Sequence, residues 1–239
     1  MGLSIVIPAY NEARRLGRTL PRVLEYAAAL GDSAEVIVVD DGSTDGTAEV
    51  AAGLARGRPR VSVLRGAVNR GKGASVRRGV LAAREDEIVF TDADLSAPIE
   101  EVAKLRAGLA EAYDIAIGSR RLDASDVRVR QPWLRGLAGR GFSRLVSLCF
   151  LPGIHDSQCG FKAFRRPAAA ALFARQRLDG YAFDVEVLWL ARRLGYRVVE
   201  VPIVWRDDPE THLRLVRDSL GMLLELARLW IGGWRGSYR

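Results

Sequence analysis

This chain of 239 residues is 49% hydrophobic and 27% charged, which is typical of a soluble globular protein with a sizeable core. Its formal net charge of +7 favours an anionic partner such as a nucleotide, a membrane surface or a nucleic acid. No run of about eighteen apolar residues could span a bilayer, and the first residues read as a strand rather than a signal peptide. We therefore expect a cytoplasmic protein whose two cysteines, Cys149 and Cys159, are buried thiols.

Short β-rich runs alternate with helical stretches through the first half of the chain. Near-continuous apolar strands that alternate with helices predict an α/β fold with a parallel sheet covered on both faces. The expected strands span residues 3–7, 35–39, 60–64, 87–90 and 114–117, and the expected helices span 13–30, 45–56, 71–84 and 98–111.

The second half has a different character. An arginine-rich stretch precedes an apolar patch over residues 145–154, and a helix near 182–194 leads into a strand over 197–201. Apolar residues at helical spacing then predict a last helix over about 209–231. With no internal repeat or low-complexity linker, we expect one domain over residues 1–208 and an amphipathic helix with a tail over 209–239.

Polar residues follow every expected strand of the first half. In open α/β sheets, ligands bind at the carboxyl ends of the strands, so we place the functional site at this edge. The loops concerned are 8–12, 40–43, 69–73, 92–94 and 118–120.

The most informative of these loops carries two acids, Asp92 and Asp94, with no Lys or Arg beside them in the sequence. Two carboxylates at the end of a buried strand repel each other unless a cation lies between them. Hard oxygen ligands at this spacing suit Mg²⁺ or Mn²⁺, completed by phosphate oxygens. The alternative is that Asp94 and Ser96 cap the helical stretch that follows Pro98.

The loop that begins at Asp41 superficially resembles a calcium-binding loop. Ala52 stands where a bidentate Glu is required, and no helix precedes the loop, so we reject a calcium site. We expect a turn in which Ser43 or Thr44 caps the next helix, which leaves Asp41 able to accept hydrogen bonds from a base or a ribose.

Residues 66–73 nearly spell a phosphate-binding P-loop. Gly73 replaces the Ser or Thr that would hold magnesium, which argues against that motif. Lys72 at a helix N-terminus could still contact a diphosphate. His155 has no partner at metal-ligand spacing, so we expect a structural histidine.

The last helix has an apolar side that includes Leu223, Leu224 and Trp230, with Arg214, Arg217 and Arg228 elsewhere on its surface. Basic residues with interfacial aromatics suit a helix that lies in the headgroup layer of a membrane. The alternative is that the apolar side packs on the domain or on a second subunit.

The loops together resemble those of family-2 glycosyltransferases, which have the GT-A fold: a Rossmann-like, mostly parallel sheet with helices on both faces. The resemblance rests on residues 4–12, 38–45, 69–73 and 92–94, in order and spacing. Residues 156–162 and 181–186 are similar to the polyprenol-phosphate branch, and above all to dolichyl-phosphate β-glucosyltransferases.

The resemblance implies a nucleotide-sugar donor, a lipid-phosphate acceptor and a Mg²⁺ or Mn²⁺ ion held by Asp92 and Asp94. It assigns residues 1–120 to the nucleotide sugar and 121–208 to the acceptor. The residues expected to bind the nucleotide sugar are Pro8, Ala9, Tyr10, Glu12, Asp40, Asp41, Lys72, Asp92, Ala93, Asp94, Arg206, His212 and Arg214. The expected catalytic residues are Asp94, Arg120, Arg135 and Asp184.

The predicted reaction is inverting transfer of glucose from UDP-glucose to a polyprenyl phosphate by a protein peripheral to the cytoplasmic face of a membrane. A lipid phosphate is already largely dianionic, so it needs arginines more than a base. The alternatives are GDP-mannose as donor, or a soluble glycan hydroxyl as acceptor with Asp184 or Asp156 as base. A nucleic-acid-binding module is disfavoured because stacking aromatics are not interleaved with the basic residues.

Overall fold

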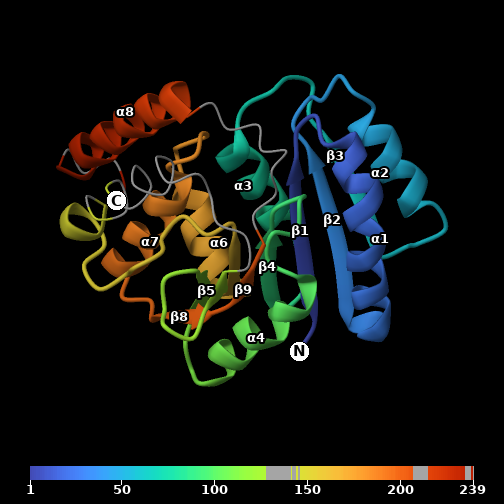
Figure 1. The fold of residues 1–239 in the computed structure, drawn as a ribbon, viewed down its shortest axis with the longest axis horizontal. Coiled ribbons are helices and arrows are strands. Elements are labelled where there is room, and N and C mark those ends of the chain that lie inside the picture. Colours follow the sequence, from blue (N-terminus) through green and yellow to red (C-terminus); the bar gives the residue numbers. More distant parts are fainter. Residues whose placement is uncertain (128–140, 142–143, 145, 207–214, 235–237, 239) are drawn as a thin grey trace.

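The structure, a computed structural model, describes residues 1–127, 141, 144, 146–206, 215–234 and 238, with side chains left out of account for 215–220 and 234. Its centre is a seven-stranded sheet with the strand order β3-β2-β1-β4-β7-β5-β8 (Figure 1). The strands are β1 (Leu3–Ala9), β2 (Ala34–Asp40), β3 (Val61–Arg65), β4 (Glu87–Thr91), β5 (Ile115–Ser119), β7 (Phe161–Arg165) and β8 (Val198–Pro202).

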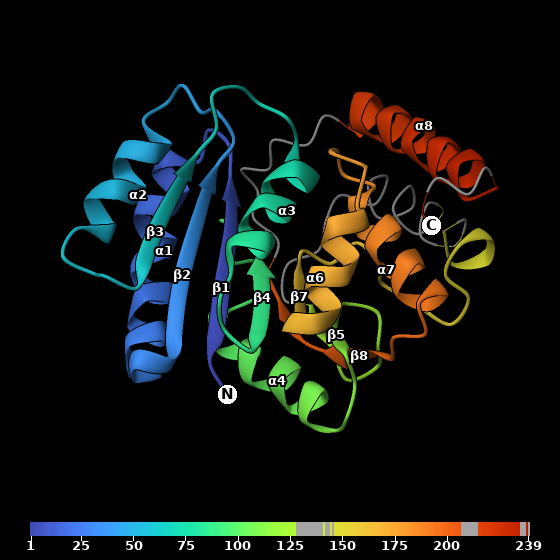
Figure 2. The ribbon, with the colours of Figure 1, turned by 180° about the vertical axis from the view of Figure 1, so that it is seen from behind.

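Helices cover both faces of this sheet, as the alternation in the sequence predicts (Figures 1 and 2). The five expected strands of the first half are all present, and β1 pairs in parallel with both β2 and β4. The helices are α1 (Ala13–Ala29), α2 (Thr47–Ala55), α3 (Lys72–Ala82), α4 (Val102–Ala110), α6 (Arg166–Arg175), α7 (Phe183–Arg193) and α8 (Leu215–Trp234), with short 3₁₀ turns η1 (Gly31–Ser33) and η2 (Ile99–Glu101).

Each face of the sheet has its own hydrophobic core. One core joins α1, α2 and α4 to the sheet through residues such as Leu16, Leu20 and Leu105. The other joins α3, α6, α7 and α8, with Phe90, Phe164, Phe173 and Phe183 among its members. Strands buried on both faces read as continuous apolar runs, which explains why the sequence pattern located them.

One strand of the sheet, β7, was not predicted. It lies antiparallel between β4 and β5, with Thr91 opposite Phe161 and Glu87 opposite Arg165. Because β7 runs against β4, its first residue lies at the carboxyl end of β4. The preceding segment 156–160 is thereby brought to the edge where the acid pair lies.

Further along the chain, β6 (Asp126–Val127) pairs in parallel with β9 (Val204–Trp205) in a separate two-stranded sheet. Cys159 is buried as expected, whereas Cys149 is exposed, so the prediction of two buried thiols is wrong for Cys149. Within the described part of the chain, no helix combines the length and the apolar character needed to cross a membrane.

Candidate active site

The acid pair lies directly beyond β4, at the carboxyl edge of the sheet. The pair also shapes its own turn, because Asp94 Oδ1 accepts the Ser96 N–H at 2.8 Å. On the other side, Gly160 touches Asp92: a Cβ added to Gly160 would lie 2.0 Å from Asp92 Oδ2. A residue without a side chain is therefore required at position 160 if Asp92 is to keep this position.

The cation beside the acid pair comes from a distant part of the sequence. Lys72, the first residue of α3, places Nζ 2.5 Å from Asp92 Oδ1. Burial alone would lower the pKa of Lys72, but Asp92 and Asp184 raise it, so the ammonium stays charged. No Lys or Arg lies beside Asp92 and Asp94 in the sequence, but the fold brings Lys72 into contact with Asp92.

The surroundings of Asp94 favour its neutral form. Burial and the neighbouring carboxylate of Asp92 both raise the pKa of Asp94. The ionised form of Asp94 is thus destabilised, and a divalent cation between the two carboxylates would stabilise it.

The donor set at this point suits the expected ion. Two carboxylates are hard oxygen ligands, and Mg²⁺ or Mn²⁺ commonly takes one or two of them and completes its shell with water and phosphate oxygens. Among the described residues, no group of three or more His, Cys, Asp or Glu side chains forms a metal cage. Asp92 and Asp94 therefore fit an ion that the diphosphate of a ligand would share.

A second ion pair lies deeper in the site. Asp184, in the first turn of α7, accepts a hydrogen bond from Lys162 Nζ at 2.5 Å, and Lys162 also donates to the Cys159 carbonyl at 2.6 Å. Both side chains are buried. Burial raises the pKa of Asp184, while Lys162 and Lys72 oppose that rise. The carboxylate of Asp184 is thus paired with the ammonium group of Lys162 and lies near that of Lys72.

Arg120, directly after β5, is clamped by a buried carboxylate. Its Nε and Nη2 donate to the two oxygens of Asp156 at 2.7 and 2.8 Å, and its backbone N–H donates to Asp156 Oδ2 at 2.9 Å. The guanidinium also lies 4.8 Å from the ring centroid of Trp205. Burial alone would lower the pKa of Arg120, but Asp156 raises it and Asp92 adds to that rise, so this arginine lies within the field of Asp92.

A further layer supports that clamp. Glu200 on β8 accepts the Asp156 N–H at 2.9 Å and the His155 N–H at 2.8 Å, and it lies 2.7 Å from His155 Nδ1. His155 thus has the structural role that the sequence predicted for it.

The loops after β1 and β2 are tied to each other. Asn11 N–H donates to Ser43 Oγ at 2.9 Å, and Thr44 N–H donates to Asn11 Oδ1 at the same distance. The expectation that Ser43 or Thr44 caps the next helix is wrong: α2 has Gly46 at its N-cap position, and Asp45 Oδ1 accepts the Thr47 N–H.

Asp41 organises the third loop of this edge. Its Oδ1 accepts the Arg70 N–H at 3.0 Å and its Oδ2 accepts the Gly71 N–H at 2.8 Å. These contacts join the loop after β2 to the start of α3. Neighbouring Asp40 is also buried and accepts the Ser43 N–H.

The remaining nucleotide-site candidates lie around these loops. Tyr10 is 44% exposed after β1, while Pro8 and Ala9 are buried within it. Glu12 forms an ion pair with Arg15 at 2.9 Å. The Ala93 carbonyl accepts the Thr19 hydroxyl at 2.7 Å.

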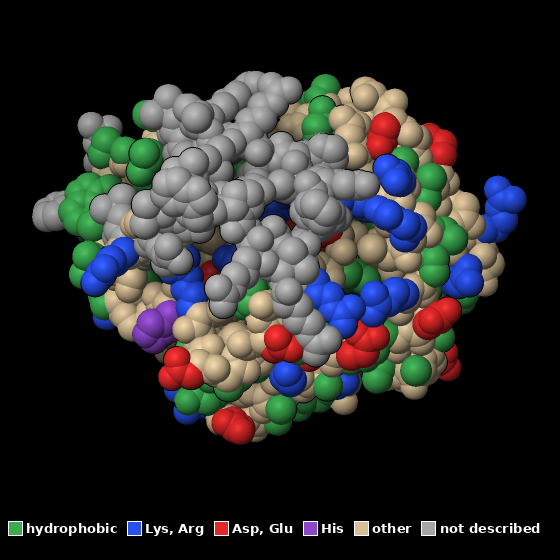
Figure 3. Space-filling view, in the orientation of Figure 1, with side chains coloured by type: hydrophobic (Ala, Val, Ile, Leu, Met, Phe, Trp, Pro, Cys, Tyr) green, Lys and Arg blue, Asp and Glu red, His purple; other side chains and the backbone are tan. Residues whose placement is uncertain are grey.

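The acceptor side is described only in part. Arg206 is exposed, and its backbone N–H donates to the Ser96 carbonyl, which brings the end of β9 to the acid-pair turn. Arg135, His212 and Arg214 lie outside the described residues. Figure 3 shows Lys and Arg side chains along the border of the grey residues on this face.

The sequence reasoning missed the two residues that hold other site residues in place. In the sequence, Lys162 is one residue of the segment 156–162 that resembles the family, and Asp156 is a candidate base. A signal for Lys162 exists: a lysine inside the apolar run Phe161–Phe164 must find a buried partner. Asp156 carries no such signal, because its partner Arg120 lies 36 residues away.

Comparison with known proteins gives the class of the site. The chain matches the profile of Glycosyl transferase family 2 over residues 4–173. It belongs to that family and is a glycosyltransferase.

Individual relatives narrow the class further. The chain is 37% identical over 250 residues to a "Dolichyl-phosphate beta-glucosyltransferase" of Drosophila melanogaster, covering 98% of this chain and 77% of that protein. It is also 37% identical over 234 residues to "Glycosyltransferase AglD" of Haloferax volcanii, covering 95% of this chain and 37% of that protein.

A solved structure shares the fold. Glucosyl-3-phosphoglycerate synthase from Mycobacterium tuberculosis, crystallised with Mn²⁺ and UDP-glucose, superposes with a TM-score of 0.67 at 22% identity, covering 94% of this chain and 78% of that chain. The predicted GT-A architecture, with its mostly parallel sheet and a C-terminal helix, is confirmed.

Proposed function

We propose that the chain transfers glucose from UDP-glucose to a polyprenyl phosphate such as dolichyl phosphate, with inversion at the anomeric carbon. The observation that carries this proposal is the near full-length similarity to a dolichyl-phosphate β-glucosyltransferase. It is supported by a site in which a lysine, an arginine and an acid pair converge at one edge of the sheet. Residues 1–208 form the catalytic domain in this proposal.

The donor binds along the carboxyl edge of β1, β2 and β4. The nucleoside lies by Tyr10, Glu12 and Asp41, on loops whose mutual hydrogen bonds hold them in a fixed shape. The diphosphate lies beside the ion pair of Lys72 and Asp92. Asp92 and Asp94 would hold a Mg²⁺ or Mn²⁺ ion, and the chemistry that such an ion would supply there is partial neutralisation of the charge on the leaving diphosphate.

In the transfer step, an oxygen of the acceptor phosphate attacks the anomeric carbon from the side opposite the diphosphate. The bond from that carbon to the UDP oxygen breaks, and UDP leaves with the electron pair. The acceptor is dianionic near neutral pH, with a second pKa near about 6, so no base is required. Arg120, kept charged and oriented by Asp156, counters its charge.

The soluble-hydroxyl alternative requires a base, and both candidates are poorly placed for that role. Asp156 is bonded to Arg120 and Asp184 to Lys162, and both carboxylates are buried. Arg120 lowers the pKa of Asp156, which makes this carboxylate a weak proton acceptor. Burial raises the pKa of Asp184, so the argument against Asp184 rests on its burial and on its hydrogen bond to Lys162. These contacts favour a phosphate acceptor over a hydroxyl acceptor.

A lipid acceptor lies in a membrane, so the protein requires a surface that can dock there, and α8 offers such a surface. Leu223, Leu224, Trp230 and Ile231 are between 43% and 56% exposed on this helix. Leu148 is 76% exposed on the segment that α8 contacts through Phe150 and Trp230. An apolar helix face with a tryptophan and nearby arginines suits docking in the headgroup layer at the cytoplasmic face.

The direct test is an assay of purified protein with Mn²⁺ or Mg²⁺, a polyprenyl phosphate, and radiolabelled UDP-glucose or GDP-mannose in parallel. We expect label from UDP-glucose alone to enter the organic phase. If label enters the organic phase from GDP-mannose alone, the donor is GDP-mannose and the transferred sugar is mannose. Release of UDP without lipid labelling would overturn the acceptor.

The metal assignment has its own test. The Asp94→Ala variant is expected to lose at least about 100-fold in activity and to lose the response to added Mn²⁺. Full activity in this variant would exclude the acid pair as the metal site.

A further inference from the structure

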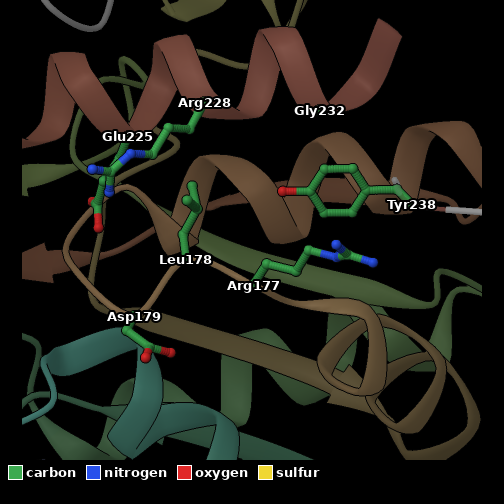
Figure 4. A pocket seen from close by; sticks show the side chains of 7 residues that line it. All are labelled: Arg177, Leu178, Asp179, Glu225, Arg228, Gly232 and Tyr238. Atoms are coloured by element: carbon green, nitrogen blue, oxygen red, sulfur yellow. The ribbon is translucent and has the colours of Figure 1, made fainter. Parts of the chain in front are cut away.

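Glu225 is an acidic residue of α8 that points into the protein rather than toward solvent. Its Oε1 accepts the Gly180 N–H and its Oε2 accepts the Ala182 N–H, each at 3.0 Å. The approach is close: a Cβ added to Gly180 would lie 2.3 Å from Glu225 Oε1. Figure 4 shows the side chain extending from α8 toward the segment that carries Leu178 and Asp179.

The segment that Glu225 holds, residues 178–182, rests on the start of α3. The Asp179 carbonyl accepts the Ala74 N–H at 3.2 Å. A Cβ at Gly71 would lie 2.4 Å from the Asp179 oxygen, and a Cβ at Gly73 would lie 2.6 Å from the Leu178 oxygen. The first turn of α3 and this segment are therefore in direct backbone contact.

Two site residues depend on the position of this segment. Lys72 stands between Gly71 and Gly73, and its ammonium reaches Asp92 at 2.5 Å. Ala182 is the N-cap residue of α7, and Asp184 follows two residues later. A shift of residues 178–182 would therefore move the ammonium of Lys72 and the carboxylate of Asp184 relative to the acid pair.

The carboxylate of Glu225 is not needed merely to pack α8. Leu226 and Leu229, 4% and 0% exposed, already bury the inner side of the helix. An open pocket of about 420 Å³ lies beside the contact, so apolar packing does not continue across it. Charge-assisted hydrogen bonds to two amides are the specific link between α8 and the segment.

We propose that Glu225 is a positioning residue for the donor site. Its two hydrogen bonds fix residues 178–182, and through them the first turn of α3, so that Lys72 is held where it meets the diphosphate of the donor. This role rests on the proposed function in one respect, namely that Lys72 binds a nucleoside diphosphate.

The test compares Glu225→Gln with Gly180→Ala. Glutamine keeps the size of the side chain, but its NH₂ group would face one of the two N–H donors. Alanine at position 180 breaks the same contact from the other side, at a backbone conformation open to any residue. Measurements are the dissociation constant of UDP with Mn²⁺ by calorimetry, the donor KM and kcat, and the Tm.

Each variant is expected to raise the UDP dissociation constant and the donor KM about tenfold, with kcat within about twofold, because Lys72 binds the diphosphate in both the ground and the transition state. The double variant should equal the single ones, since both changes break one contact. Glu111→Gln, an exposed Glu at the end of α4, is the matched control and should change nothing.

Two results overturn the proposal. One is a lowered Tm with unchanged UDP affinity and donor KM, which would make Glu225 a purely structural contact. The other is a wild-type protein that binds no UDP. A wild type that binds UDP but glucosylates no lipid phosphate would refute the proposed acceptor alone, because the affinity comparison needs no acceptor.

Discussion

Replacing Asp156 with Asn isolates the contact that holds Arg120. Asp156 is fully buried and accepts three hydrogen bonds from Arg120, at 2.7, 2.8 and 2.9 Å. Asparagine has nearly the same shape and keeps one oxygen, but its NH₂ group faces the guanidinium. The substitution therefore removes the balancing charge and one acceptor while leaving the volume of the core unchanged.

The magnitude follows from burial. Removing one partner of a fully buried ion pair costs about 3–5 kcal/mol. The Arg120 side chain is 25% exposed, so solvent screens part of the loss, and we expect about 2–3 kcal/mol. For a chain of this size, that loss corresponds to a fall in Tm of about 5–10 °C.

The activity is expected to fall further than stability alone would require. An arginine displaced by about 1 Å from the reacting phosphate costs on the order of 100-fold in kcat/KM. The assay is lipid glucosylation well below the Tm of the variant, beside thermal unfolding by circular dichroism. Asp114→Asn, at the opposite end of β5, is the matched control, since Asp114 Oδ2 accepts only a backbone N–H from Arg197 in the described structure.

The pH dependence gives an independent check on the same pair. Burial alone would raise the pKa of Asp156, but Arg120 and its hydrogen bonds lower it below its usual value. A carboxyl group with a lowered folded pKa contributes stability above its unfolded pKa, near about 3.9, and loses it as pH falls through the folded pKa. The difference in Tm between wild type and Asp156→Asn should be constant above about pH 5 and narrow below about pH 4.

Two outcomes would refute this reasoning. If Asp156→Asn kept full kcat/KM while its Tm fell, the orientation of Arg120 would be irrelevant to transfer. If the Tm were unchanged, the buried pair would make no net contribution to stability.

Other substitutions test the remaining parts of the site. Asp184→Asn should lower kcat/KM by at least about tenfold without removing the acidic limb of the pH–rate profile, because Asp184 holds Lys162; loss of that limb would make Asp184 a base. Changing Leu224 and Ile231 together to Gln should reduce flotation with anionic vesicles by about tenfold or more and leave UDP binding intact. Leu81→Gln, an exposed leucine of α3, is its control, and equal flotation of both variants would exclude α8 as the membrane contact.

The sequence predicted the first half of the sheet because that half is built from local patterns. Each of β1 to β5 is a short apolar run followed by a polar loop, and the chain alternates regularly with helices. The antiparallel strand β7 breaks this alternation. Its place between β4 and β5 depends on pairing with residues 45 to 78 positions away, as in Ile88 with Phe164, and no periodicity records such a pairing.

The same limit applies to the candidate site. The acid pair was found because both carboxylates lie in one loop. Lys72 with Asp92, Arg120 with Asp156 and Lys162 with Asp184 were not found, because each pair joins residues about 20 or more positions apart. Sequence patterns can place side chains at one edge of a sheet, but which charges meet there is decided by packing in three dimensions.

The C-terminal helix shows why periodicity and burial must be considered together. The spacing of apolar residues in α8 identified Leu223, Leu224, Trp230 and Ile231 as one side, and the usual inference is that such a side packs on the domain. In the structure that side is exposed, and the helix instead packs through Leu226 and Leu229.

α8 carries apolar residues both on the side that faces the domain and on its exposed side. The inner side of α8 packs against α7 and residues 178–182, and there Glu225 accepts two backbone hydrogen bonds. On the outer side, Leu223, Leu224, Trp230 and Ile231 are between 43% and 56% exposed, and this is the surface proposed to meet the membrane. The exposed side of α8 is thus the surface proposed to meet the acceptor lipid, while its inner side contacts the segment that supports Lys72. In this proposal, the same helix serves both acceptor binding and donor binding.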